Sequence, residues 1–262
     1  MPVPRCQDAV NSARYTVRFL ENRNGLRVRL VEMQSPLGAE APVWLHVHGI
    51  TSSWLHGLRY RQPAGRLGFR LFMVELVNHG GSQRVKGGST WGCQEKWDVI
   101  AALEEIARLY PRAPVLVSAT SMGTLVVTEA ALEQPAVFDP VRGVVFESPV
   151  PDLRALYDIF EERAGWLRPV LPSWKTMLSM TRWRSDTDLS GCFRQDNRAS
   201  LPLLTFLSRE EFPDPRRREE ITRRLRFSRV ETVVLSRGRH NAYWNYQPRD
   251  FEEHIRRFFS AH

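Results

Sequence analysis

The sequence predicts an α/β fold in which a mostly parallel central sheet is flanked by helices. Apolar runs with the length of buried strands alternate along the chain with segments whose apolar residues recur at helical spacing. One run, Val115–Val117, passes through a turn of small residues into the apolar helical segment Leu125–Leu132. Strands that alternate with helices favour a parallel sheet covered on both faces, and functional groups then collect at the carboxyl ends of its strands.

The first half of the chain begins with a predicted β-hairpin over residues 15–34. Apolar and polar residues alternate in both halves of this segment, and the Asn24-Gly25 pair between them is expected to form a tight turn. Apolar runs at residues 43–50 and 69–76 predict two buried strands. Within residues 94–110, apolar side chains recur every three or four positions, which predicts a helix with one apolar face.

The second half of the chain predicts the remaining strands and a helical insertion. The strands are expected at residues 115–117, 141–149, 203–207 and 231–236. Residues 149–200 are then expected to form a helical lid, and residues 1–148 and 201–262 the core domain. The apolar residues of this lid favour a role in lining an acyl or hydrophobic pocket. The alternative is a cap that packs on the core without touching substrate.

Length and charge make several classes of protein improbable. A chain of 262 residues is expected to form one α/β domain with a modest insertion. The formal charge of +8 comes almost entirely from arginine, and arginine alternates with glutamate in the densest run, residues 216–225. That alternation is typical of a solvated helix face, and it lacks the interleaved aromatic residues of single-strand-binding proteins. We therefore expect no nucleic-acid partner, although the arginines would suit an anionic or carrier-bound substrate.

Nothing in the sequence predicts a membrane span, a secretory signal or a metal site. No run approaches the roughly 20 apolar residues that cross a bilayer, and the N-terminus lacks an apolar signal region. The three cysteines, Cys6, Cys93 and Cys192, lie far apart and are not expected to form a disulfide framework. A reducing cytoplasm is therefore the expected compartment. His46 and His48 have H-x-H spacing, but no further cluster of ligands accompanies them.

The turn Ala119-Thr120-Ser121-Met122-Gly123 is the most informative segment, because it joins a predicted strand to a predicted helix. A serine on such a turn stands above the edge of the sheet. The helix N-terminus beneath it favours negative charge that develops during a reaction. Small residues beside Ser121 suit this strained turn, so the pattern is typical of a nucleophilic serine.

This turn and three further motifs follow one another in the order that is typical of the α/β-hydrolase superfamily. The chain resembles that superfamily from about residue 15 to its end. The departures from the family pattern are Ala119 in place of the first glycine of the serine turn, and Glu75 and Asn78 in the second motif. The segment from His240 to Pro248 is similar to serine hydrolases of the BEM46-like or serine esterase kind. The three further motifs are His48-Gly49, Glu75-x-x-Asn78-His79-Gly80-x-Ser82 and Gly238-Arg239-His240.

The resemblance implies a catalytic triad and neither a metal nor an organic cofactor. Ser121 is the expected nucleophile and His240 the expected general base. The acid is expected after the strand at residues 203–207, where counting from the end of the strand selects Glu211. Its role would be to orient His240 and to stabilise the imidazolium. The alternatives for the acid are Glu210, Asp214 and, at the end of the preceding strand, Glu147.

The resemblance further implies that the backbone N–H groups of Ile50 and Met122 form the oxyanion hole. The expected function is hydrolysis of an ester, a thioester or a related acyl bond in a small molecule. One alternative is an acyltransferase or cyclising thioesterase that passes the same acyl-enzyme to an alcohol, an amine or the substrate itself. Another is a hydrolase-fold protein that binds a ligand without turnover. Neither the acyl group nor the oligomeric state can be predicted.

Overall fold

A computed structural model describes residues 15–34, 37–86, 88–152, 197–211 and 215–262. Its centre is an eight-stranded sheet with the order β1-β2-β4-β3-β5-β6-β7-β8. The strands are β1 (Tyr15–Glu21), β2 (Arg27–Met33), β3 (Val43–Val47), β4 (Arg70–Glu75), β5 (Val115–Thr120), β6 (Val141–Glu147), β7 (Ala199–Ser208) and β8 (Phe227–Leu235). From β4 to β8 all neighbours in the sheet are parallel, whereas β1–β2 and β2–β4 are antiparallel.

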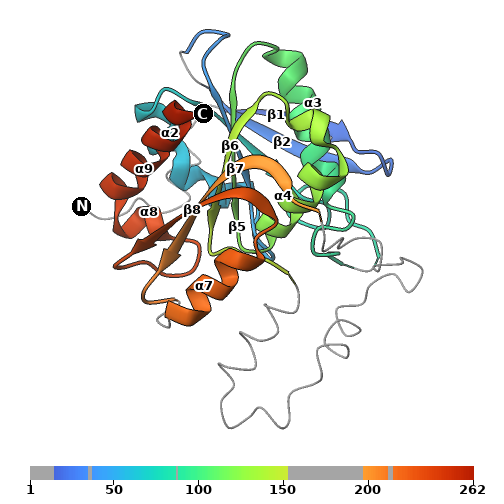
Figure 1. Ribbon diagram of the computed structural model, residues 1–262. Coiled ribbons are helices and arrows are strands. Elements are labelled where there is room, and N and C mark those ends of the chain that lie inside the picture. The colour runs from blue at the N-terminus through green and yellow to red at the C-terminus, as the bar shows by residue number, and fades with distance from the viewer. Residues whose placement is uncertain (1–14, 35–36, 87, 153–196, 212–214) are drawn as a thin grey trace.

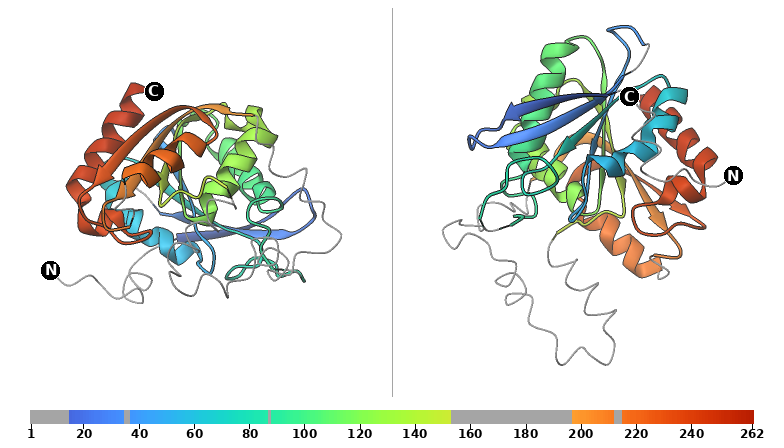
Figure 2. Two further views of the ribbon diagram at one scale, coloured as in Figure 1. Left: turned by 60° about the horizontal axis from the view of Figure 1, so that its bottom comes forward. Right: turned by 180° about the vertical axis from the view of Figure 1, so that it is seen from behind.

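Helices cover both faces of this sheet (Figures 1 and 2). On one face lie α3 and α4, and on the other lie α2, α8 and α9. The helical elements are η1 (Trp54–Tyr60, a 3₁₀ helix), α2 (Arg61–Arg66), α3 (Lys96–Leu109), α4 (Met122–Glu133), η2 (Pro135–Phe138, also 3₁₀), α7 (Pro215–Arg224), α8 (Tyr243–Tyr246) and α9 (Pro248–Ala261). The predicted α/β-hydrolase fold, with a mostly parallel sheet between helices, is therefore confirmed in the described residues.

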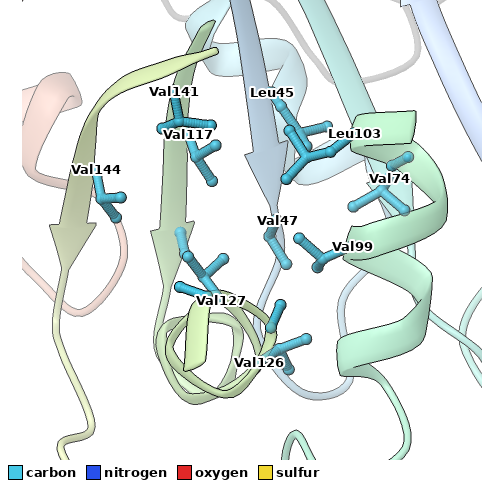
Figure 3. Close-up of a cluster of buried hydrophobic side chains, with 14 of the residues drawn as sticks. Leu45, Val47, Val74, Val99, Leu103, Val117, Val126, Val127, Val141 and Val144 are labelled. Carbon is cyan, nitrogen blue, oxygen red and sulfur yellow. The ribbon is translucent and has the colours of Figure 1, made fainter. Parts of the chain in front are cut away.

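Each face of the sheet packs its own hydrophobic core. Under α3 and α4, side chains such as Val47, Val99 and Val126 interdigitate (Figure 3). Under α9, Phe251 and Phe258 belong to a second cluster of buried side chains. A sheet buried on both faces explains why the central strands are continuous apolar runs rather than alternating ones.

The hairpin at residues 15–34 is present, and Asn24-Gly25 lies in its turn, where the Gly25 N–H donates to the carbonyl oxygen of Asn22 at 2.9 Å, but the loop is longer than predicted. Glu21 pairs with Arg27, so five residues rather than two connect the strands. The Asn22 side chain accounts for the longer loop, because its Oδ1 accepts hydrogen bonds from the N–H groups of Asn24 (2.9 Å) and Leu26 (3.0 Å). An asparagine that bonds to its own backbone in this way stabilises a wider turn.

The boundary between the sheet and the predicted lid also differs. Strand β7 begins at Ala199, so residues 199–200 belong to the sheet and not to the insertion. Pro202 conceals this start in the sequence, because proline cannot donate to a strand ladder, and the pairing is irregular between Ala199 and Pro202. Residues 153–196 of the predicted lid lie outside the described residues, so the lid itself stays a prediction.

Cys93 is buried and disulfide-bonded, with the other half of the bond outside the described residues. The sequence analysis expected no disulfide framework and did not predict this single bond. Pairing depends on the distance between Cα atoms in space, which separation along the chain does not reveal. Disulfides are typical of oxidising compartments, so this bond weighs against the expected reducing cytoplasm. None of the helices in the described ranges has the length and apolar character needed to cross a membrane.

Candidate active site

Ser121 occupies the turn between β5 and α4 with a backbone conformation that side chains rarely adopt. Its φ is 51° and its ψ is −124°, and 9% of the residue is exposed. Two glycines make room for this turn. A Cβ on Gly123 would lie 2.6 Å from the carbonyl oxygen of His48, and one on Gly49 would lie 3.0 Å from the Cβ of Ser121. The loop after β3 and the start of α4 can therefore both approach the serine.

The backbone around Ser121 leaves two N–H groups without an acceptor. Within the described ranges, neither Ile50, which follows Gly49, nor Met122, the first residue of α4, donates its N–H to another group. By contrast, the N–H of Ser121 itself bonds to the carbonyl oxygen of Glu147 at 3.2 Å. Free N–H groups at a helix N-terminus attract negative charge, so this arrangement suits an oxyanion.

His240 and Glu211 form a hydrogen-bonded pair at the carboxyl edge of the sheet. Glu211 follows β7 and His240 follows β8, and the ring Nδ1–H donates to Glu211 Oε1. The Glu211 side chain is 4% exposed, whereas the His240 side chain is 51% exposed. A buried carboxylate therefore orients an imidazole whose other face reaches solvent, which is the arrangement of a general base with its acid.

The other candidate acids have different partners. Glu210 accepts the N–H of Gly238 at 3.1 Å. Glu147 accepts the N–H of Tyr243 at 3.2 Å and bonds to Tyr60, with Arg59 beside it. Asp214 lies outside the described residues. Among the described candidates, Glu211 is thus the carboxylate that contacts His240.

Ser121 lies at the same edge of the sheet as this pair, because the parallel strands β5, β7 and β8 all end there. Among the described residues, no hydrogen bond joins the Ser121 hydroxyl to His240. The structure therefore brings His240 and Glu211 together at this edge, without a direct contact between His240 and Ser121 in the described residues. Catalytic hydrogen bonds of this kind often tighten only in the complex with substrate.

Two further residues donate hydrogen bonds to Glu211, and the sequence analysis did not identify either of them. The Ser148 hydroxyl donates to Glu211 Oε2 at 2.9 Å, and the Tyr243 hydroxyl donates to the same oxygen. Burial, followed by the nearby Glu211 carboxylate, raises the pKa of Tyr243, so the phenol stays protonated and able to donate. No sequence signal marked either residue, since Ser148 only follows a strand and Tyr243 only follows the histidine motif.

The remaining histidines of the motifs are structural. In His48, Nδ1 donates to the carbonyl oxygen of Gly49 (2.7 Å) and Nε2 accepts the N–H of Leu76 (3.1 Å). Burial lowers the pKa of His48 to about 3, so the ring is neutral and holds the loop after β3 in place. His46 bonds to Ser118 through Nδ1 at 3.0 Å, but its buried Nε2 has no partner in the described residues. Among the described residues, the His46 ring is therefore only half satisfied.

The described residues contain no group of three or more histidine, cysteine, aspartate or glutamate side chains that could hold an ion. The burial of His46 and His48 lowers the pKa of each ring chiefly by desolvation, and their bonds are to neutral groups. The described groups at this edge of the sheet are hydroxyl, imidazole, carboxylate and backbone N–H groups.

Comparisons with known proteins agree with the fold. An esterase from Pyrococcus furiosus superposes with a TM-score of 0.69 at 19% identity, covering 100% of this chain and 97% of that chain. An epoxide hydrolase from Vigna radiata gives a TM-score of 0.62 at 18% identity, covering 95% and 98% of the two chains. No curated protein matches the sequence. Residues 44–260, however, match the alpha/beta hydrolase family. That match covers most of the chain and shows that this protein is an enzyme of the alpha/beta hydrolase family.

Proposed function

We propose that this enzyme cleaves an ester, a thioester or a related acyl bond through an acyl-enzyme on Ser121. The observation that carries the proposal is the juxtaposition of a strained serine turn with a histidine–carboxylate pair at one edge of the sheet. A serine hydroxyl is a weak nucleophile until a base takes its proton, so the pair supplies what Ser121 needs.

The described groups divide the steps of the proposed reaction among them. Ser121 Oγ attacks the acyl carbon while Nε2 of His240 takes the hydroxyl proton, and the acyl oxygen becomes an oxyanion. The N–H groups of Ile50 and Met122 donate to that oxyanion. His240 then gives its proton to the departing alcohol or thiol. A water molecule, deprotonated by the same ring, hydrolyses the acyl-enzyme, and Glu211 stabilises the imidazolium in both steps.

The chemistry of Ser121 favours an acyl substrate over an epoxide, although both esterases and epoxide hydrolases share the fold. Attack of a serine oxygen on an acyl carbon produces an ester, which water can hydrolyse with the same base. Attack on an epoxide carbon would produce an ether, which acid–base chemistry at neutral pH does not cleave. A serine in this position therefore supports turnover of an acyl substrate rather than of an epoxide. The substrate is a small acyl compound, either free or attached to a carrier.

The test is labelling with a fluorophosphonate probe, followed by intact-mass measurement of wild type, Ser121→Ala and Ser118→Ala. Ser118 is the matched control, because it is a buried serine in β5 that bonds to Trp44 (2.7 Å) and His46. We expect one adduct on wild type and on Ser118→Ala, and none on Ser121→Ala. Folded wild-type protein without an adduct, or an adduct that survives in Ser121→Ala, would contradict the assignment.

A further inference from the structure

We propose that Glu147 and Ser148, together with Tyr243, are positioning residues that fix the nucleophile turn, the acid and the histidine loop relative to one another. The inference rests on the proposed function and adds residues that lie outside the triad. Glu147 ends β6, and Ser148 follows it directly. Strand β6 lies between β5, which carries Ser121, and β7, which leads to Glu211, so this dipeptide stands at the centre of the site.

The first contact of the dipeptide is with the serine turn. Thr120 pairs with Glu147 at the last position of the β5–β6 ladder, and the Ser121 N–H then bonds to the Glu147 carbonyl oxygen at 3.2 Å. Directly after this bond, Ser148 adopts a φ of 49°, a conformation that is unfavourable for a residue other than glycine. Such strain persists only where the surroundings hold it, and here Ser148 is fully buried.

The second contact is with the acid. The Ser148 hydroxyl has one proton, which it gives to Glu211 Oε2 at 2.9 Å, and the Tyr243 hydroxyl donates to the same oxygen. Two donors on Oε2 leave Oε1 for the Nδ1–H of His240. The carboxylate is thereby prevented from rotating, and the direction in which it accepts from the imidazole is fixed.

The third contact is with the loop that carries His240. The N–H of Asn241 donates to the Ser148 hydroxyl at 3.1 Å, and the N–H of Tyr243 donates to Glu147 Oε2 at 3.2 Å. The other oxygen of Glu147 bonds to Tyr60, with Arg59 Nη2 at 3.4 Å to balance its buried charge. Two consecutive residues therefore hold the backbone on the C-terminal side of the histidine.

These contacts predict how the site responds when one hydroxyl is removed. In Tyr243→Phe the aromatic ring stays in place, but Oε2 of Glu211 keeps only the Ser148 donor. The carboxylate then turns more freely and presents more negative charge to the imidazolium. His56 lies within electrostatic reach of His240, and burial lowers the pKa of His56 to about 3, so the His56 ring stays neutral near pH 7.

The experiment compares wild type with Tyr243→Phe, Ser148→Ala and the matched control Tyr110→Phe. The Tyr110 hydroxyl also donates to a glutamate, Glu32, at 2.6 Å, but on the other side of the molecule. Hydrolysis of a chromogenic ester gives kcat and KM, and its pH profile gives the midpoint of the acidic limb. NMR titration of the His240 ring, assigned with His240→Gln, gives the same midpoint without any turnover.

For Tyr243→Phe and Ser148→Ala we expect kcat to fall about 10-fold to 100-fold with KM unchanged, since misplacement by about 1 Å can cost a factor of 100. The His240 midpoint should move to higher pH in both variants and stay at the wild-type value in Tyr110→Phe. Folded Tyr243→Phe with wild-type kcat and an unshifted midpoint would overturn the inference. If wild type shows no hydrolysis that depends on Ser121, the proposed function fails, and the NMR titration still decides whether these residues position His240.

Discussion

Glu211 and Glu32 are both buried glutamates that accept a hydrogen bond from a tyrosine hydroxyl. They differ in the nitrogen-containing side chain that pairs with the carboxylate, which is histidine in one case and arginine in the other. Glu211 lies after β7 and pairs with His240, whose side chain is half exposed. Glu32 lies on β2, where Arg18 Nη1 approaches to 2.7 Å and Arg70 Nη1 to 3.2 Å. The two sites thus share a carboxylate–tyrosine contact, but an imidazole pairs with Glu211 and two guanidinium groups pair with Glu32.

The difference decides what each glutamate can do. A guanidinium is always charged, so the interaction around Glu32 does not change and can serve only to hold the hairpin against the rest of the sheet. An imidazole gains and loses its proton near neutral pH, so the interaction at Glu211 strengthens when His240 becomes charged during a reaction. A buried carboxylate contributes to acid–base chemistry only when its partner can change protonation and reach a substrate.

Removing the titrating partner should have the largest effect. In His240→Ala the serine loses its base, and turnover should fall on the order of 10⁴-fold to 10⁶-fold, as for a residue that acts in one unit with the nucleophile. Ester hydrolysis by the purified variant measures this. The control is His254→Ala on α9, which should keep turnover within about twofold because that ring packs against Phe206. Equal activity in wild type and His240→Ala would remove the distinction between the two glutamates.

Replacing each carboxylate with an amide should lower kcat in one variant and the free energy of unfolding in the other. In Glu211→Gln the amide no longer fixes the imidazole orientation, so kcat should fall about 10²-fold to 10⁴-fold while the protein stays folded. In Glu32→Gln the arginines lose their counter-charge, and the free energy of unfolding should fall by about 3 kcal/mol with kcat unchanged. Urea denaturation and ester hydrolysis of both variants test the pair. If Glu32→Gln lowers kcat, or if Glu211→Gln lowers only the free energy of unfolding, the roles assigned to the two glutamates are contradicted.

The sequence predicts the parts of this site that depend on local pattern. The serine turn follows from small residues between a strand and a helix, and Glu211 follows from its distance to the end of a predicted strand. The contacts of Ser148 and Tyr243 with Glu211 could not be predicted, because they arise only when the ends of β6, β7 and β8 meet. Their positions depend on strand order, which no single segment encodes.

The same physical reason explains the errors in the fold. The longer hairpin loop depends on the side chain of Asn22, and the early start of β7 depends on pairing with β8 on either side of Pro202. The disulfide of Cys93 depends on a spatial neighbour. The strands and helices themselves repeat an apolar pattern along the chain, and that repetition is what sequence analysis can detect.

A third buried carboxylate, Asp98, has no cationic partner among the described residues, and its pKa differs accordingly. It accepts from the Asn22 amide (2.6 Å) and the N–H of Val77 (2.8 Å), and burial raises its pKa from 3.8 to about 8. Between these values the folded protein holds a proton that the unfolded chain has released, so the free energy of unfolding falls as pH rises through this window. Asp98→Asn should remove that part of the slope. Urea denaturation at about pH 5 and about pH 9 measures it, and equal slopes in wild type and variant would contradict the pKa.

The smallest effect is expected from Arg18, which interacts with Glu32 while partly in water. Its side chain is 26% exposed and lies 3.8 Å from Glu105 as well, so solvent screens both interactions. Arg18→Met keeps the apolar stem and should cost at most about 1 kcal/mol of stability, with kcat unchanged. The loss should shrink further as salt is raised from about 0.1 M to about 1 M, because the Debye length then falls from about 10 Å to about 3 Å. A larger loss of stability that salt does not reduce would show that Arg18 interacts with Glu32 as a buried ion. Arg70 alone would then be insufficient to stabilise the Glu32 carboxylate.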